Sequence, residues 1–231
     1  MKNTAKLLIS GMLLLGTPTM FAQECKDYFP HKEGTVLTYK NYDKKDKVTG
    51  TSVISIKERK ETPEGISVLL LSKYIDDKGE EVFENQMPVE CRNGVLYMDM
   101  SKYLDPAAMG AYSAMDVEVS ADNLDLPLGG PEGTVLGDGT VTAVVRNSGL
   151  KIATITMDIS DRMIAARERL ETPAGAFDCL KITYNILSQI GFVKVNMSAT
   201  EWYSPEYGTI RSETYNKKGK LVSYMVLNSV D

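Results

Sequence analysis

Two neighbouring stretches, 177–187 (FDCLKITYNIL) and 192–203 (FVKVNMSATEWY), decide the fold class of this 231-residue chain. In the first stretch the even-numbered residues from Leu180 to Ile186 are apolar or aromatic, and polar residues separate them. In the second stretch the odd-numbered residues from Val193 to Ala199 alternate with polar residues in the same way. Alternation of this kind predicts strands that bury one side and expose the other, as in antiparallel sheets.

Similar β-rich runs continue along most of the chain, and turn-forming sequences separate them. Among the turns, Asn93-Gly94 is the most specific, because both residues accept the positive φ of a type I′ hairpin turn. Further strands are expected at 35–42, 51–59, 66–75, 82–91, 95–100, 140–146, 151–159, 209–215 and 221–227. This punctuation is typical of an all-β, antiparallel meander.

Only one segment predicts a helix, and it lies between two groups of strands. Asp105 is a suitable N-cap before a proline at the first helical position, and the residues up to Met115 are mostly good helix formers, although Gly110 weakens the pattern. The stretch 124–139 is rich in Gly and Pro and is interpreted as an irregular loop. We therefore expect strands at roughly 34–100 and 140–228, joined by a short helix and a loop.

The first 22 residues have the order of a secretory signal peptide. Lys2 and Lys6 precede an apolar run from Leu7 to Leu15, and Ala22 ends a stretch of small-to-medium residues. The apolar run is too short to span a membrane, which takes about 20 residues. We expect cleavage after Ala22, leaving residues 23–231 as a single exported β domain that is periplasmic or secreted.

Cys25 raises the question of lipid attachment, because it lies shortly after the expected cleavage point. A lipoprotein signal requires an aliphatic residue three positions before the cysteine and a small residue immediately before it. Here those positions hold Ala22 and Glu24, and Glu24 is neither small nor neutral. We therefore expect a free product and not a lipoprotein.

The charge balance limits the classes of partner. Without residues 1–22 the chain has 24 basic residues (26 minus Lys2 and Lys6) and 31 acidic ones, a net charge of −7. Nucleic acids and anionic membrane surfaces are bound by clustered Lys and Arg, and the chain has no basic run. We expect neither nucleic acid nor an anionic membrane surface as a partner, and no membrane-spanning segment in the mature chain.

Three cysteines in an exported chain allow one disulfide and one free thiol, with three pairings open. Cys91 lies just before the Asn93-Gly94 turn, and Cys25 lies in the leader before the first strand, so a Cys25–Cys91 disulfide would tie the leader to one end of the sheet. Cys179 lies within a strand and could equally be a buried thiol. We expect the Cys25–Cys91 pair, with an effect on stability and none on activity.

The sequence contains no recognisable catalytic or metal-binding motif. His31 is the only histidine, and no C-x-x-C pair is present, so a histidine-based metal centre, a zinc site and thioredoxin-like chemistry lack their usual ligands. No phosphate-binding loop, dinucleotide fingerprint or nucleophile elbow occurs either. The sequence assigns no catalytic residue, no metal and no cofactor, and it favours a non-enzymatic protein.

Three stretches together resemble a known family. They are 24–30 (ECKDYFP), 172–182 (TPAGAFDCLKI), and 201–205 (EWYSP) with 208–211 (GTIR). With the recurrent Asp-Lys-Gly turns they resemble an exported family of Bacteroides-type bacteria, called TapB-like or left as a domain of unknown function. Its members are similar to proteins with the YmcC-like fold. The resemblance implies a curved antiparallel sheet or half-barrel, and it brings no activity, cofactor or catalytic residue.

A curved sheet with a helix over its concave side suggests a binding site for a lipid-like, glycan or peptide ligand, or for an envelope protein. Met109, Tyr112 and Met115 follow a spacing of three and would face inward together as a deformable apolar lid. Trp202 would report on a ligand if its strand borders the same space. The opposing interpretation is that these side chains fill the core permanently.

Two alternatives to ligand binding remain at this stage. One is a structural or interaction module with a filled core and no small ligand. The other is a polysaccharide hydrolase that uses paired carboxylates, for which Glu201, next to Trp202, and Glu213, across the next hairpin, are the candidates.

Overall fold

The computed structural model describes residue 25 and residues 33–62, 65–104 and 109–231. The expected signal peptide (1–22) and His31 lie outside the described residues. The described chain forms one antiparallel sheet of 13 strands, so the all-β prediction is confirmed. Where the chain is described, no helix is long and apolar enough to cross a membrane.

The strands follow one another mostly through short hairpins. Their bounds are β1 (Val36–Asp43), β2 (Val48–Thr62), β3 (Gly65–Asp76), β4 (Glu81–Arg92), β5 (Val95–Asp99), β6 (Asp116–Ala121), β7 (Asn123–Pro127), β8 (Gly139–Asn147), β9 (Leu150–Thr172), β10 (Gly175–Ile190), β11 (Val193–Ser204), β12 (Gly208–Asn216) and β13 (Leu221–Val230). A 3₁₀ turn, η2 (Met100–Tyr103), follows β5, and the Asp99 side chain caps it by accepting a hydrogen bond from the Ser101 amide.

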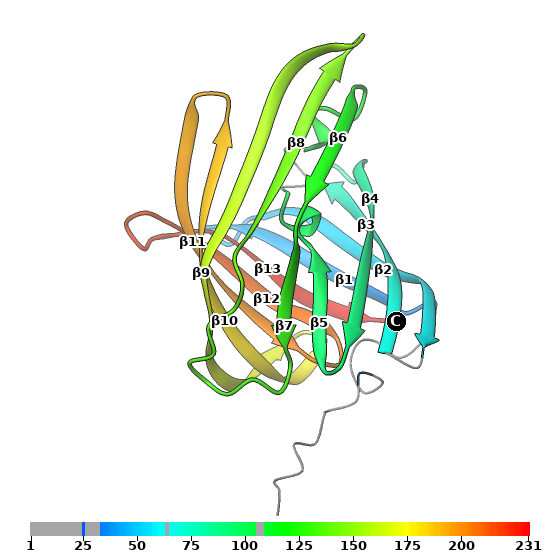
Figure 1. Cartoon of the computed structure of the whole chain (residues 1–231), viewed down its shortest axis with the longest axis vertical. Coiled ribbons are helices and arrows are strands. Elements are labelled where there is room, and N and C mark those ends of the chain that lie inside the picture. The colour runs from blue at the N-terminus through cyan, green and yellow to red at the C-terminus, as the bar shows by residue number, and fades with distance from the viewer. Residues whose placement is uncertain (1–24, 26–32, 63–64, 105–108) are drawn as a thin grey trace, which may run out of the picture.

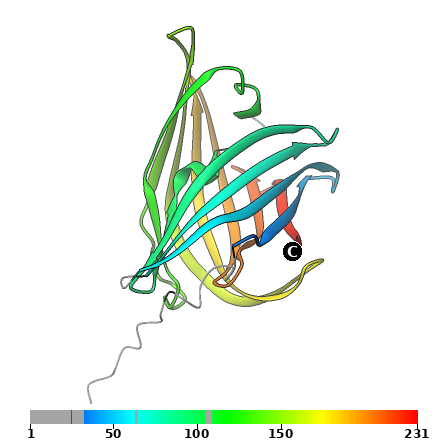
Figure 2. The ribbon, with the colours of Figure 1, turned by 90° about the vertical axis from the view of Figure 1, so that its right-hand side faces the viewer.

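The sheet curls into a nearly closed barrel (Figures 1 and 2). Its two edge strands, β6 and β7, follow each other directly in the chain, which brings the edges together. The order across the sheet is β6-β8-β9-β10-β11-β12-β13-β1-β2-β3-β4-β5-β7. Asp122 separates β6, which pairs with β8, from β7, which pairs with β5. Its amide donates to the Thr140 carbonyl, and its carbonyl accepts from the Met100 amide. This one residue therefore joins the two edges of the sheet. The barrel is more nearly closed than the half-barrel that was expected.

A buried arginine holds β7 and the segment after it against β9. Arg162 is 1% exposed, and its guanidinium donates to the carbonyls of Asp125 and Gly137 at 2.7–3.2 Å. Further along β9, the Arg167 guanidinium donates to the carbonyls of Leu128 and Gly130. Because carbonyl oxygens hydrogen-bonded to a cation are strong acceptors, these contacts close the barrel where no regular strand is present.

Three parts of the sequence interpretation need correction. The segments that become β6 and β7 were not expected as strands, and β7 lies inside the stretch interpreted as a loop. β9 continues to Thr172, 13 residues beyond the expected end at Ile159. The helix expected over 105–115 falls partly outside the described residues; within them only Met109 and Gly110 are helical, and turns with i→i−3 hydrogen bonds follow to Met115.

Most of the barrel interior is one large apolar core, and the alternating positions of the strands contribute to it. Leu180, Ile182, Tyr184 and Ile186 of β10 are all buried in it, together with Ala199 of β11. The expectation that this alternating face is buried fails near the turn of the β10–β11 hairpin. Val193 and Val195 lie on the predicted face but are 65% and 47% exposed, because β10 and β11 extend beyond the part of the barrel that covers them.

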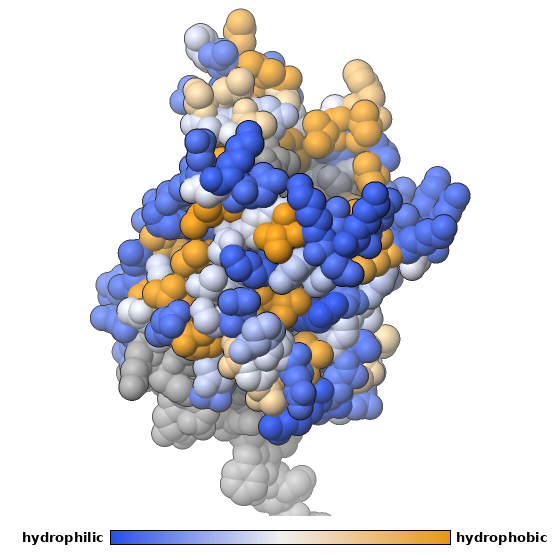
Figure 3. Space-filling model, turned by 180° about the vertical axis from the view of Figure 1, so that it is seen from behind, coloured by the Kyte–Doolittle hydropathy of each residue, from blue (hydrophilic) through white to orange (hydrophobic). Residues whose placement is uncertain are grey.

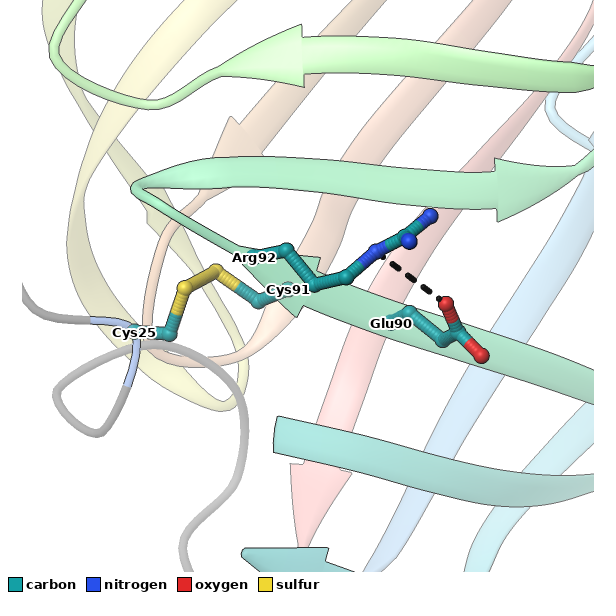
Figure 4. Close-up of a disulfide and its surroundings, with 4 residues drawn as sticks. All are labelled: Cys25, Glu90, Cys91 and Arg92. Atoms are coloured by element: carbon teal, nitrogen blue, oxygen red, sulfur yellow. Dashed lines mark ion pairs between the residues drawn. A yellow bond between two sulfur atoms is a disulfide. The ribbon is translucent and has the colours of Figure 1, made fainter. Parts of the chain in front are cut away.

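The structure contains the expected disulfide between Cys25 and Cys91, with a Cα–Cα distance of 5.6 Å (Figure 4). Cys91 is the penultimate residue of β4, so the bond lies at the end of the barrel opposite the projecting β8–β9 hairpin (Figure 1). Cys179 is a free, buried thiol. Burial raises its pKa to about 12, with the Asp178 and Glu168 charges adding to the effect, so the thiol is not activated as a nucleophile.

Candidate functional site

The barrel contains a partly open cavity of about 220 Å³. Strands β1 to β5 contribute mainly apolar walls, among them Leu37, Ile54, Leu70, Met87 and Val89. The other side of the cavity is polar and comes from η2 and from strands β10 to β12. Inward-facing side chains from opposite sides of the barrel therefore line one cavity.

The polar side is organised around Glu201 of β11, which is 3% exposed. Its carboxylate accepts a hydrogen bond from Lys102 Nζ at 3.1 Å and another from the Thr209 hydroxyl. The hydroxyls of Tyr103 and Tyr184 lie at 3.3 and 3.5 Å from its second oxygen. Tyr103 and Tyr184 also contact each other edge to face, with ring centroids 5.7 Å apart. A buried charge paired and hydrogen-bonded in this way is electrostatically compensated.

The donors keep Glu201 ionised. Burial alone would raise the pKa of this carboxyl, but the Lys102 ammonium, the Thr209 hydroxyl and the Arg162 charge together bring it below the usual value. A general acid for glycoside hydrolysis needs a raised pKa, so Glu201 is poorly suited to that role. Burial raises the pKa of Tyr103, Tyr184 and Tyr203 well above the usual value, which keeps these phenols protonated as hydrogen-bond donors.

The carboxylate pair proposed for a hydrolase does not form. In the β11–β12 register Glu201 lies opposite Ser212, whereas Glu213 lies opposite Thr200. Because side chains alternate along a strand, the two carboxylates lie on opposite faces of the sheet. Glu213 accepts hydrogen bonds from Arg211 and from the Tyr215 hydroxyl. The Glu201–Glu213 hypothesis is therefore wrong.

Met109, Tyr112 and Met115 do lie together, but they line a different space. They border a groove of about 490 Å³ between the turn at 109–115, the start of β4 and β6, with Val82 and Phe83 on its other side. Met109 is buried in the core, and Tyr112 and Met115 are partly buried against it. Gly110 permits the close approach of this turn to β4, because a Cβ at this position would lie 2.9 Å from the Val82 carbonyl oxygen.

Trp202 borders neither this groove nor the barrel cavity. It packs near Phe177 and Cys179 in a second, smaller apolar cluster. Its indole N–H donates to Glu168, and the Lys181 ammonium lies 5.2 Å from the ring centroid. The structure therefore separates Trp202 from the three residues with which it was grouped.

The sequence interpretation missed most of the cavity's polar residues. Lys102 lies 99 positions from Glu201, and Tyr103 lies 98 positions away, so no local spacing could connect them. The only sequence signal was Glu201 itself, a charged residue at an inward position of an alternating strand. Within the described part of the chain no group of three or more His, Cys, Asp or Glu side chains could hold a metal ion.

Comparison with known proteins identifies relatives of the same shape. The family described as DUF3108-like matches residues 32–227. A candidate exported protein of Bacteroides fragilis, solved with a YmcC-like fold, is 27% identical, with a TM-score of 0.78, over 88% of this chain and 98% of that one. A candidate lipoprotein of Parabacteroides distasonis is also 27% identical, with a TM-score of 0.81, over 90% of this chain and 100% of that one.

No curated protein matches the chain. The relatives confirm the YmcC-like fold that the sequence stretches implied, and the narrower TapB-like label rests on that resemblance alone. One of these relatives is described as a candidate exported protein and the other as a candidate lipoprotein, which agrees with a place outside the cytoplasm. Since the family match covers most of the chain, the protein belongs to the DUF3108-like family.

Proposed function

We propose that this protein is a non-catalytic binding protein of the cell envelope whose barrel cavity holds a small lipid-like molecule. The observation that carries the proposal is the cavity itself, about 220 Å³ of partly open space in the barrel, whose lining combines seven aliphatic and methionine side chains with five tyrosines and a polar side. The aliphatic and methionine part of the wall offers water no hydrogen-bond partner. A short hydrocarbon chain or a small ring fits the space and the lining better.

The polar side of the cavity favours a ligand with an uncharged polar end. Glu201 and Lys102 form an ion pair at 3.1 Å and compensate each other, so neither calls for a charged ligand group. Tyr203 lines the same cavity, and its buried hydroxyl has no hydrogen-bond partner among the described residues. Because an unpaired buried hydroxyl is costly, a ligand carbonyl, ester or alcohol oxygen that reached it would gain a hydrogen bond.

The groove beside Met109, Tyr112 and Met115 is the second candidate binding site. It is larger than the cavity, but acidic side chains of β4 (Glu81 and Glu84) border it. We assign these three residues to a cover over the core, with the groove as an alternative site for an apolar ligand. A glycan or peptide ligand, or an envelope protein, would fit this more polar groove better than the barrel cavity.

Export without a lipid anchor is part of the proposal. Cys25 is bonded to Cys91, so in this form it has no thiol for acylation. We propose cleavage between Ala22 and Gln23, which N-terminal sequencing of protein isolated from its own envelope would test. A chain that begins at an acylated Cys25 would contradict this proposal and would also exclude the Cys25–Cys91 disulfide.

The binding proposal is tested first by native mass spectrometry of protein purified from its own envelope, which should show a bound small molecule. Calorimetric titration then compares medium-chain alcohols, carboxylates and amines of equal length, and the alcohol should bind most tightly. Leu70→Phe narrows the cavity and should weaken binding about tenfold or more, whereas Met115→Asp, in the groove, should leave it unchanged. Tyr203→Phe keeps the shape, removes the hydroxyl and should weaken only the alcohol.

The outcomes separate the competing hypotheses. Thermal unfolding of each variant shows whether it folds, and Tyr203→Phe provides the test if Leu70→Phe does not. Binding that is lost in Met115→Asp and kept in Leu70→Phe would move the site to the groove. No bound mass and no saturable titration with any compound would leave a structural module with an incompletely filled core, and the binding proposal would be dropped.

A further inference from the structure

The ends of two hairpins expose large hydrophobic side chains. Among the described residues, 11 large hydrophobic side chains are exposed, and six of them lie at the β8–β9 and β10–β11 turns. We call these six the tip patch: Leu150, Ile152, Ile190, Phe192, Val193 and Val195. Phe192 is fully exposed, and Leu150 is 74% exposed. Single exposed apolar residues are ordinary on a protein surface, but a group of this kind indicates an interaction site.

Both hairpin ends belong to one end of the barrel (Figure 1). β9 and β10 are neighbours, with Ile190 opposite Ile155, and the Gly191 amide donates to the Thr154 carbonyl. The β8–β9 hairpin continues five residues further along β9, from Ile155 to Leu150, about 16 Å at 3.3 Å per residue. The two parts of the tip patch therefore lie at different heights. Phe192 lies beside β9 near Ile155, and Leu150 lies further out at the end of the β8–β9 hairpin. Seen from behind, hydrophobic side chains cap both projections (Figure 3).

The backbone at both ends turns tightly. At the first, Ser148 and Gly149 have φ values of 50° and 80°, and at the second Gly191 has a φ of 58°. Positive φ values of this kind are typical of the short turns that fit the twist of a hairpin. The apolar side chains are thus presented on paired strands, not on a loose loop, and exposing them needs no rearrangement of the barrel.

The charge of the two hairpin segments is opposite in sign to that of the whole chain. The segments 145–157 and 186–198 contain Arg146, Lys151 and Lys194 and no acidic residue, a formal charge of +3, and Asp116 of the neighbouring β6 lies opposite Arg146. The chain as a whole carries −5. Lysines next to exposed aliphatic and aromatic side chains are the arrangement that suits a lipid interface, where apolar groups enter the acyl region and ammonium groups remain among the headgroups.

We propose that the tip patch docks the protein on an anionic lipid bilayer. Phe192, Leu150 and their neighbours enter the interface, and the Lys151 and Lys194 ammonium groups contact anionic headgroups. The acidic composition argued against anionic membranes as partners, and this proposal reverses that expectation for the hairpin ends. This inference does not depend on a ligand in the cavity, because the patch lies outside it.

Flotation of the whole protein with vesicles tests the proposal. We expect binding to vesicles that contain phosphatidylglycerol and at least tenfold weaker partitioning to pure phosphatidylcholine. Phe192→Ser combined with Leu150→Ser should lower partitioning to the anionic vesicles at least tenfold. Val135→Ser is the matched control, because Val135 is 78% exposed on the loop between β7 and β8, away from the hairpin ends, and this variant should bind like the parent.

Two further measurements keep the outcomes distinct. Lys151→Glu with Lys194→Glu should lower binding to anionic vesicles and leave binding to neutral vesicles unchanged. Light scattering at increasing concentration tests a second copy as the occupant of the patch. The proposal is overturned if the parent protein does not float with anionic vesicles, if Val135→Ser and the double serine variant lose binding equally, or if the patch variant abolishes a dimer and not vesicle binding.

Discussion

Ile182 and Ile190 lie on the same face of the same strand, yet one is 3% exposed and the other 45% exposed. β10 pairs with β11 from Leu180 to Ile190 without a register shift, so the inward alternation continues unbroken between the two residues. At Ile182 the opposite barrel wall covers the inward face. At Ile190 the strands have passed beyond that wall. The same face of β10 is therefore open to solvent there. An apolar alternation thus defines a face, and the length of neighbouring strands decides whether it is covered.

The two regions also differ in what holds them. In the barrel body the interior carries an ion pair, a buried arginine and several buried tyrosines, and a disulfide lies at its far end. The projecting hairpins have ladder hydrogen bonds and tight turns, but little packing on their inward face. We infer that stability resides in the barrel body and that the hairpin ends are free to serve an interaction. The predictions below test this division.

The largest expected effect is the loss of the fold at alkaline pH. Burial raises the pKa of Tyr39, Tyr103, Tyr184 and Tyr203, all of which line the cavity, above the ordinary value of 10.0. For an acid whose folded pKa is raised, stability is fully present below the unfolded pKa and falls as the pH rises past it. We expect cooperative unfolding above about pH 10, with tyrosinate absorbance and loss of β-sheet circular dichroism in one step.

Tyr203→Phe provides the control for this titration. It removes one of the four buried phenols and should move the alkaline midpoint upward. Tyrosinate absorbance from all four residues before any change in the circular dichroism would show that the barrel interior is open to solvent, and the division between the two regions would be wrong.

Next in size is the disulfide. It closes a loop with a sequence separation of 66 residues, and on the chain-entropy model its removal should cost about 4 kcal/mol of unfolding free energy. Cys25→Ala with Cys91→Ala should show this loss in urea denaturation. Cys179→Ala, which removes a buried free thiol, should cost about 1 kcal/mol. Vesicle flotation of the double alanine variant should be unchanged while it remains folded, because the bond lies at the opposite end from the tip patch.

Much of the fold was predictable because most strands alternate cleanly and end at glycine-containing turns. The second half of β9 was not, and its irregularity explains why. Against β10 it has an extra residue at Ala165 and another irregularity around Asp161, whose φ is 53°. These bulges interrupt the period of two and turn Arg162 into the interior between Ile159 and Ile164. A pattern broken twice, with charged residues inside it, resembles a loop in sequence.

The candidate site was predictable only in fragments. Glu201 was noticed because of its aromatic neighbours, but its partner was sought on the adjacent strand. Its actual partner, Lys102, comes from η2 after β5, and the two meet only because the barrel closes. Met109, Tyr112 and Met115 line one groove, since a spacing of three brings side chains together in a turn as well as in a helix, and their role in ligand binding stays a prediction. Their separation from the main cavity depends on the closed barrel and has no local signal.

A smaller effect is expected from Arg162, the residue that those bulges bring inside. Arg162→Met keeps most of the volume but leaves the carbonyls of Asp125 and Gly137 without their donor, and should cost about 3 kcal/mol. Arg169→Met is the control, because the Arg169 side chain is 65% exposed and lies 3.8 Å from an exposed Asp178 carboxylate. It should change stability by less than about 0.5 kcal/mol. Equal effects in the two variants would mean that Arg162 does not hold the barrel closed.

The smallest effect tests the opening comparison directly, with one substitution made at both positions. Ile182→Val removes a methyl group from a packed site and should lower the unfolding free energy by about 1 kcal/mol. Ile190→Val makes the same change where the side chain is already half exposed, and should alter stability by less than about 0.5 kcal/mol. Urea denaturation measures both with the same slope, because neither change alters the surface that unfolding exposes. A loss at Ile190 as large as that at Ile182 would show that the projecting end of β10 is packed in solution, and a covered tip patch could not also dock on a bilayer.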